Sequence, residues 1–185
     1  MDKEFWKGRN VFVTGATGLL GSWLVNKLIK KEANVTCLIR DWVFNSYLAL
    51  SGNLGCINIV RGELEDYFTL LRAINEYEIE TVFHLGAQTI VGTASRSVLS
   101  TFESNIKGTW NILEASRVCS KLVRRLIIAS SDKAYGVHEK LPYTEETPLL
   151  GRFPYDVSKA CSELLAISYF LFYFHHAYII MLCLV

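Results

Sequence analysis

Residues 10–32, NVFVTGATGLLGSWLVNKLIKKE, combine an apolar run, three glycines and an amphipathic segment. The beginning of this stretch, NVFVTG, predicts a buried strand, and the part after Gly18 carries apolar residues at helical spacing and ends in lysines that suit a helix C-terminus. Gly15, Gly18 and Gly21 lie between the two elements. Glycine permits a turn with positive φ and leaves the backbone bare, and a helix N-terminus offers free N–H groups. This context predicts a phosphate-binding turn.

Strand and helix patterns alternate along the rest of the chain. Strands are expected at residues 34–40, 56–62, 81–87, 122–131 and 177–185, and helices at 66–78, 97–119 and 154–170. Asp66 is the expected N-cap of the first of these helices, and Pro154 suits the first turn of the last. The alternation predicts an α/β fold, in which helices cover both faces of a doubly wound parallel sheet in three layers. We expect one domain over residues 1–185, with ligands at the carboxyl ends of the strands.

Composition narrows the class of protein. About half of the 185 residues are hydrophobic, as in a globular domain, and 19 basic residues against 18 acidic ones leave a net charge of +1. No basic block is present, so nucleic acid is not an expected partner. The five cysteines form no C-x-x-C motif, which predicts buried, reduced thiols in a cytoplasmic protein. The first ten residues lack the apolar segment of a signal peptide. His175 and His176 are adjacent and cannot share a metal from one helix face, so no metal site is expected.

The glycine loop predicts a nicotinamide dinucleotide cofactor. The second strand ends in LIRDW, where an acid favours NAD and an arginine favours NADP, and Arg40 and Asp41 leave that choice open. Both residues, like Glu63, could equally be solvated surface charges. His84 is expected to be a hydrogen-bonded histidine at a strand end and not a base. The expected cofactor-binding residues are Gly15, Thr17, Gly18, Leu19, Leu20, Gly21, Arg40, Asp41, Glu63, Leu64, Leu85, Gly86, Ala87 and Gln88, with Tyr155 and Lys159.

Two short motifs predict catalytic groups. Tyr155 and Lys159 of YDVSK are four residues apart and share a helix face. A nearby ammonium lowers the pKa of a tyrosine from about 10, so the pair could take a proton from an alcohol. The segment ASSDKAYG, residues 129–136, presents Ser131, Asp132 and Lys133 at the mouth of a buried strand. The alternatives are a turn hydroxyl followed by a solvated ion pair.

Five motifs carry a resemblance to a known family. TGATGLLG, HLGAQ, NIKGTWNILEA, SSDKAYG and YDVSK match the extended short-chain dehydrogenase/reductases in order and spacing over residues 8–168. The resemblance implies a Rossmann fold, a nucleotide-sugar substrate, and a homodimer formed through the helices that contain Asn105 and Tyr155. Asn105 itself reads as a core residue that fixes its helix. Most sugar-nucleotide 4,6-dehydratases have Asp-Glu where this chain has Asp132 and Lys133, and the Asp-Lys pair is similar to the CDP-glucose branch.

The resemblance also implies a reaction. Tyr155 would remove the proton of the sugar 4-hydroxyl, which Ser131 holds, while hydride passes to NAD. Asp132 would protonate the leaving 6-hydroxyl, and Lys133 would act as the C5 base or shape that base's field, giving a 4-keto-6-deoxy sugar. A 4-epimerase or reductase, which needs no elimination pair, is the enzymatic alternative. The other alternative is a cofactor-binding remnant that has no enzymatic activity.

The end of the chain departs from the family pattern. No Asp, Glu, Lys or Arg occurs from Leu164 to Val185, and the resemblance fades near Leu171. We interpret this segment as a helix end followed by a buried strand, with a frame-altered sequence or a membrane span as alternatives. The resemblance implies that the C-terminal substrate domain is absent from this chain. Whether the chain is active, and which sugar nucleotide it would use, therefore stay open.

Overall fold

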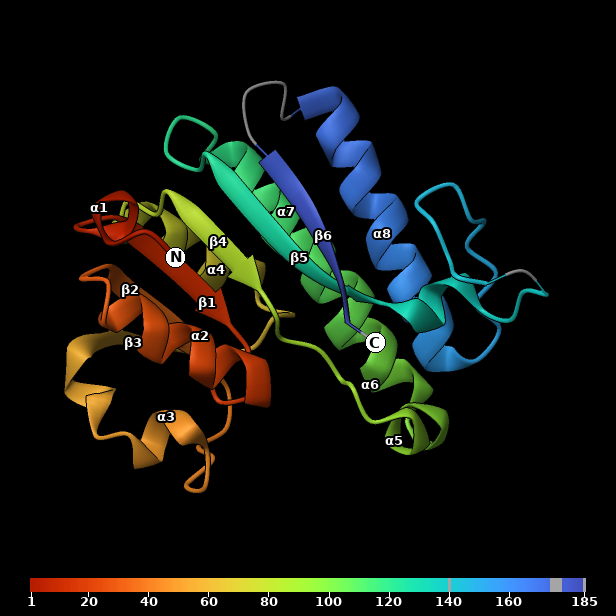
Figure 1. The fold of residues 1–185 in the computed structure, drawn as a ribbon, viewed down its shortest axis with the longest axis horizontal. Coiled ribbons are helices and arrows are strands. Elements are labelled where there is room, and N and C mark those ends of the chain that lie inside the picture. The colour runs from red at the N-terminus through yellow and green to blue at the C-terminus, as the bar shows by residue number, and fades with distance from the viewer. Residues whose placement is uncertain (140, 174–177, 185) are drawn as a thin grey trace.

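The computed structural model describes residues 1–139, 141–173 and 178–184, and in the last of these ranges it describes the backbone only. Six parallel strands form one sheet in the order β3-β2-β1-β4-β5-β6 (Figure 1). The strands are β1 Asn10–Thr14, β2 Asn34–Ile39, β3 Ile57–Arg61, β4 Thr81–His84, β5 Arg125–Ser131 and β6 Tyr178–Leu184. The order reverses between β1 and β4, so the predicted doubly wound parallel sheet is confirmed.

Helices connect the strands and cover both faces of the sheet. They are α1 Lys3–Trp6, α2 Leu19–Ile29, α3 Tyr47–Leu50, α4 Tyr67–Glu76, α5 Val91–Arg96, α6 Val98–Phe102, α7 Gly108–Val118 and α8 Pro154–Tyr173. In Figure 1, α2 lies in front of the sheet, and α4 and α7 lie behind it. The short turns η1 Asn53–Cys56 and η3 Asp132–Tyr135 are 3₁₀-helical. The expected three layers are therefore present.

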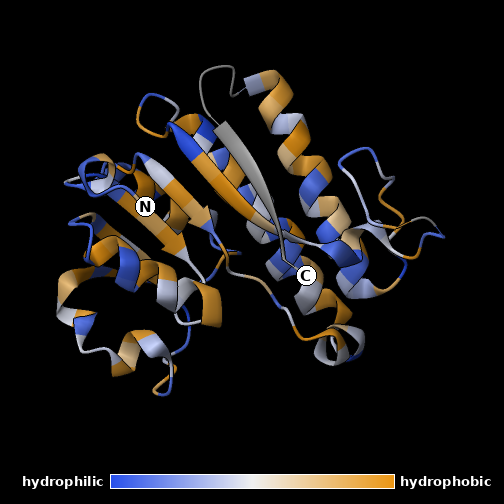
Figure 2. Ribbon diagram, in the orientation of Figure 1, coloured by the Kyte–Doolittle hydropathy of each residue, from blue (hydrophilic) through white to orange (hydrophobic). Residues whose placement is uncertain are grey.

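Alternation along the strands builds two cores. Val11 and Val13 face α1 and α2, where they pack with Val25 and Leu28. Phe12, between them, faces the opposite layer of α4, α7 and α8. This follows from the two-residue period of a strand, which sends successive side chains to opposite faces. The β1 and β4 ribbons are accordingly largely orange in Figure 2, as expected of strands buried on both sides.

Local signals set the helix boundaries. Asp66 caps α4 as predicted, because its carboxylate accepts the backbone N–H of Thr69 at 3.1 Å. Pro154 is the first residue of α8. The helix expected at 97–119 is observed as α6 and α7 joined by a π-helical turn, η2, over Glu103–Lys107. Single π turns of this kind often mark functional sites.

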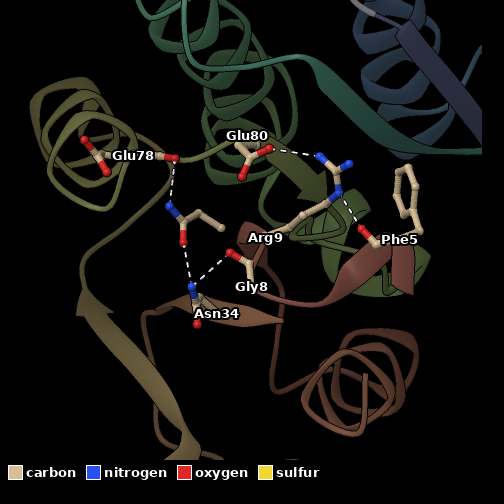
Figure 3. Close-up of polar contacts among 7 residues, drawn as sticks. Phe5, Gly8, Arg9, Asn34, Glu78 and Glu80 are labelled. Atoms are coloured by element: carbon tan, nitrogen blue, oxygen red, sulfur yellow. Dashed lines mark hydrogen bonds and ion pairs between the residues drawn. The ribbon is translucent and has the colours of Figure 1, made fainter. Parts of the chain in front are cut away.

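A polar network joins the amino ends of the strands (Figure 3). The Arg9 guanidinium donates to the Phe5 carbonyl and, at 3.0 Å, to Glu80 just before β4. The Asn10 amide donates to the Glu78 carbonyl at 3.2 Å. Asn34 donates to Asn10 at 3.0 Å and to the carbonyl of Gly8 at 3.1 Å. These hydrogen bonds tie together the amino ends of β1, β2 and β4, at the edge of the sheet opposite the carboxyl ends where a ligand is expected.

The cysteine prediction is only partly correct. Cys37 and Cys119 are buried free thiols, whereas Cys56 is exposed and Cys161 is half-buried. Cys56 is exposed because it is the last residue of the surface turn η1 and lies outside β3, the strand in which it was expected. The side chain of Cys183 lies outside the described residues, as do His175 and His176. Among the helices in residues 1–139 and 141–173, none combines the length and the hydropathy of a transmembrane span.

Candidate functional site

The glycine loop closes tightly between β1 and α2. Gly15 adopts φ +71°, and a Cβ there would lie 2.7 Å from the backbone nitrogen of Gly86. A Cβ on Gly21 would lie 2.1 Å from the Gly15 carbonyl oxygen. Gly18 is the N-cap of α2 and provides no side-chain cap, so the first N–H groups of the helix remain available to an anion.

A cavity of about 830 Å³ opens above this loop, at the carboxyl ends of β1, β2 and β4. Most of the expected cofactor residues line it: Gly15, Thr17, Gly18, Leu19, Leu20, Gly21, Arg40, Asp41, Leu64, Leu85, Gly86 and Ala87. Trp23, Leu38, Val43, Gly62, Glu65, Thr89 and Ser104 also line it, although the sequence did not single them out. The cavity is therefore where the doubly wound fold predicts a ligand.

Four of the expected cofactor residues do not belong to this lining. Glu63 is exposed, and the next two residues of the same turn face the cavity instead. Gln88 is held by Asn105, which accepts the Gln88 N–H at 2.7 Å and donates to the Gln88 carbonyl at 3.0 Å. Tyr155 and Lys159 lie on α8, next to β5. The two hydrogen bonds between Asn105 and the Gln88 backbone are tertiary contacts that no local sequence pattern predicts.

A buried histidine supports the cavity wall, as expected for His84. Its Nδ1 lies 2.8 Å from the Thr14 hydroxyl, which also accepts the N–H of Gly86 at 3.0 Å. Its Nε2 lies 3.1 Å from Thr109, whose hydroxyl donates to the Asn105 carbonyl. This network assigns the imidazole proton to Nε2. Burial, together with the nearby Lys159 charge, lowers the pKa of His84 to about 3, so the ring is neutral at pH 7.

The rim of the cavity carries an ion pair and an aromatic stack. Arg40 Nε lies 2.6 Å from Asp41 Oδ2, and both side chains are exposed. Trp23 of α2 stacks on Tyr47 of α3 with ring centroids 4.1 Å apart. The acid that would favour NAD and the arginine that would favour NADP are therefore paired with each other, so the geometry keeps both cofactor forms open.

The structure brings Ser131, Asp132 and Lys133 to the carboxyl end of β5. The Ser131 hydroxyl donates to Asp132 Oδ1 at 3.1 Å and accepts the N–H of Lys133 at 3.3 Å. Lys133 Nζ lies 3.4 Å from Asp132 Oδ2. A quarter of the Asp132 side chain is exposed against 56% for Lys133, so the acid lies deeper than the lysine. The Asp132 carboxylate and the Lys133 ammonium therefore lie together at the carboxyl end of β5.

Tyr155 and Lys159 occupy the first turns of α8, beside the turn that carries Asp132 and Lys133. Both are buried, at 8% and 6% exposure. Lys159 Nζ donates to the Ala129 carbonyl of β5 at 3.0 Å. Burial lowers the pKa of this ammonium to about 8, although the charge of Glu163 opposes the shift. A lysine in this state can hold or release a proton near neutral pH.

Comparison with known proteins assigns the family. The profile described as GDP-mannose 4,6 dehydratase matches residues 12–183. The chain belongs to this family. The predicted resemblance to the epimerases and dehydratases among the extended short-chain dehydrogenase/reductases is thereby confirmed at family level.

Relatives of this dehydratase-family chain include dehydratases and epimerases. It is 32% identical to CDP-glucose 4,6-dehydratase of Salmonella typhimurium, over 91% of this chain and 47% of that protein. It is 29% identical to UDP-glucose 4-epimerase of Lactobacillus helveticus, over 83% and 44% respectively. An Agrobacterium tumefaciens short-chain dehydrogenase/reductase solved with bound NAD superposes with a TM-score of 0.77 at 28% identity, over 94% of this chain and 48% of that one. The chain thus spans about half the length of these relatives.

Proposed function

We propose that the cavity above the glycine loop binds NAD. The observation that carries this proposal is the tight glycine loop beside the cavity. Its conformation needs residues without a Cβ, because a Cβ on Gly15 or Gly21 would strike backbone atoms of the protein itself. The bare backbone and the uncapped N-terminus of α2 suit a pyrophosphate. The likeness to an NAD-bound relative supports the same cofactor. When bound, NAD would accept a hydride from the substrate and return it. Asp41 would hold the ribose of NAD, whereas Arg40 keeps NADP as the alternative.

The side chains at the end of β5 suit acid–base work on a sugar. We propose that Tyr155 takes the proton of the sugar 4-hydroxyl while Ser131 orients that group. Lys159, buried and charged one turn further along, stabilises the phenolate. Asp132 then protonates the leaving 6-hydroxyl. Lys133 removes the C5 proton or shapes the field of the base that does.

The substrate we propose is CDP-glucose, converted into a 4-keto-6-deoxy sugar with loss of water. The Asp132–Lys133 pair and the identity to the Salmonella dehydratase support this assignment. A 4-epimerase is the second candidate, favoured by the likeness to the Lactobacillus enzyme. It would use Tyr155 without needing the elimination pair. A cofactor-binding domain without turnover is the third reading. Because the chain spans about half of its relatives, the reaction is proposed for the whole protein.

We also propose a cytoplasmic homodimer. The described half-buried and exposed cysteines are unpaired, as expected in a reducing compartment. The outer surfaces of α7 and α8 expose apolar side chains, among them Trp110, Leu164, Leu171 and Phe172. Figure 2 shows this character along the C-terminal half of α8. Packing such faces against a second copy would bury them.

The test combines cofactor binding with product analysis. The purified chain is incubated with NAD and CDP-glucose, and the sugar product is followed by NMR. Loss of the C6 oxygen with a C4 carbonyl supports the dehydratase, whereas C4 inversion with C6 intact supports the epimerase. Asp132→Asn should lower dehydration at least 100-fold, the usual contribution of general acid–base catalysis, without weakening NAD binding. NAD binding with no product in the wild type would favour the non-catalytic reading.

A further inference from the structure

A second buried carboxylate lies next to Lys159, and the proposed reaction does not use it. Glu163 is one helical turn further along α8 and is only 6% exposed. Its Oε1 accepts a hydrogen bond from the hydroxyl of Ser130. Lys159 donates to the carbonyl of Ala129 at 3.0 Å. Two adjacent residues of β5, Ala129 and Ser130, therefore each hold one of two oppositely charged side chains of α8.

We propose that Glu163 is a positioning residue, which keeps the Lys159 ammonium charged and seated against β5. The role of Lys159 in catalysis rests on the proposed function above, but the influence of the Glu163 charge on Lys159 does not. A bare ammonium at this depth would lose its hydration, and one carbonyl replaces only one of its three donor contacts. The carboxylate supplies the compensating charge.

The charges around Lys159 agree with this role. Burial depresses the pKa of Lys159, and Glu163 acts against that depression. Burial raises the pKa of Glu163, while the Ser130 hydrogen bond and the Lys159 charge lower it. On β4, His84 also faces this charge and stays neutral, with a pKa near 3. Tyr155 and Asp156 are the buried titratable groups in the preceding turn of α8. Glu163 is thus the anion that sustains the Lys159 charge.

Ser130 has a distinct part in the arrangement. Its hydroxyl hydrogen-bonds the ionised form of Glu163 and so favours the carboxylate over the neutral acid. Removing this hydroxyl should raise the pKa of Glu163 without removing the carboxyl group. A Ser130 variant is therefore a milder perturbation than the loss of the carboxylate.

The experiment measures the titration of Lys159 directly. The ¹³Cε resonance of Lys159 reports its protonation and is assigned by its loss in Lys159→Arg. The full chain is titrated as wild type, Glu163→Gln, Glu163→Asp and Ser130→Ala. We expect the midpoint to fall by about 1 pH unit or more in Glu163→Gln, as for loss of a close opposite charge. Ser130→Ala, which keeps the carboxylate, should shift it less than Glu163→Gln does, and Glu163→Asp should retain part of the wild-type value.

Glu114→Gln is the matched control. Glu114 is also a hydrogen-bonded carboxylate, paired with Arg117 on α7, and it does not act on Lys159. Its variant should leave the Lys159 midpoint unchanged. An unchanged midpoint in folded Glu163→Gln would overturn the proposal. If that variant does not fold, an unchanged midpoint in folded Glu163→Met, which removes the charge and keeps a side chain of similar volume, overturns it equally. A thermal shift with NAD on the wild type tests the proposed function separately, because the titration needs no cofactor.

Discussion

Gly21 offers the sharpest test of the loop geometry. Gly21→Ala would place a Cβ 2.1 Å from the Gly15 carbonyl oxygen and 2.8 Å from the Gly15 carbonyl carbon, far inside the 3.4 Å where ordinary contact begins. Both atoms belong to the backbone, so a change of side-chain rotamer cannot relieve the clash. Overpacking of this kind costs about 1–3 kcal/mol. For a chain of this size, about 2 kcal/mol lowers Tm by roughly 4–8 °C.

The same substitution should also abolish dinucleotide binding, because the relaxed loop no longer presents its N–H groups. The assay is thermal unfolding with and without NAD. At 100 times its Kd, a ligand of the native state adds about 2.7 kcal/mol, so the wild type should rise visibly in Tm while Gly21→Ala should not. Gly92→Ala is the control, since a Cβ on this α5 residue would meet nothing within 4 Å. It should be neutral or stabilise the chain by up to about 1 kcal/mol. A Gly21→Ala chain with wild-type Tm and an intact NAD shift would show that this position tolerates a Cβ and that the loop does not need it bare.

Three further predictions concern stability and assembly. Folding depresses the pKa of His84 from 6.5 to about 3, so the neutral ring stabilises the folded state fully above pH 6.5, and this stabilisation is lost as the pH falls toward 3. In His84→Gln, the free energy of unfolding should therefore fall less with decreasing pH, by on the order of a few kcal/mol. Urea unfolding across that pH range measures the difference. Glu80→Gln should lower the unfolding free energy by about 0.5–1 kcal/mol because it breaks the half-buried pair with Arg9, whereas Glu76→Gln, in an exposed pair, should cost no more than about 0.5 kcal/mol. Leu171→Glu should convert a dimer into a monomer in light scattering, and an unchanged mass would contradict the proposed interface.

Much of the fold could be predicted because its signals are local. The strand–Gly–helix pattern around Gly15 and the alternation of apolar runs are sufficient for a doubly wound sheet. The Asp66 cap could be read from residue type and position alone. Equally, the charge-free run after Leu164 was correctly divided into a helix and a strand, since α8 continues to Tyr173 and β6 follows from Tyr178.

The parts that could not be predicted depend on contacts between distant segments. Glu63 and Glu65 look alike in the sequence, and only the turn after β3 decides that Glu65 faces the cavity. Asn105, seventeen residues after Gln88, holds the Gln88 backbone, and the Gln88 side chain accepts the N–H of Ile90 at 3.0 Å. Trp23 reaches the cavity rim beside Tyr47 of a short helix that no periodicity announced.

The second charged pair of the site shows the same limit. The sequence identifies Tyr155 and Lys159 through their spacing, but it does not reveal that Glu163 is buried beside them. That depends on the packing of α8 against β5, where the Ser130 hydroxyl meets the carboxylate. Electrostatic tuning is therefore accessible only once the elements are assembled.

Dinucleotide binding at the glycine loop can be measured by calorimetric titration of the purified chain with NAD and, in parallel, with NADP. We expect saturable, one-site binding of NAD that Gly21→Ala abolishes and Gly92→Ala preserves. Heat of binding that is absent from the wild type, or equal in wild type and Gly21→Ala, would contradict this expectation.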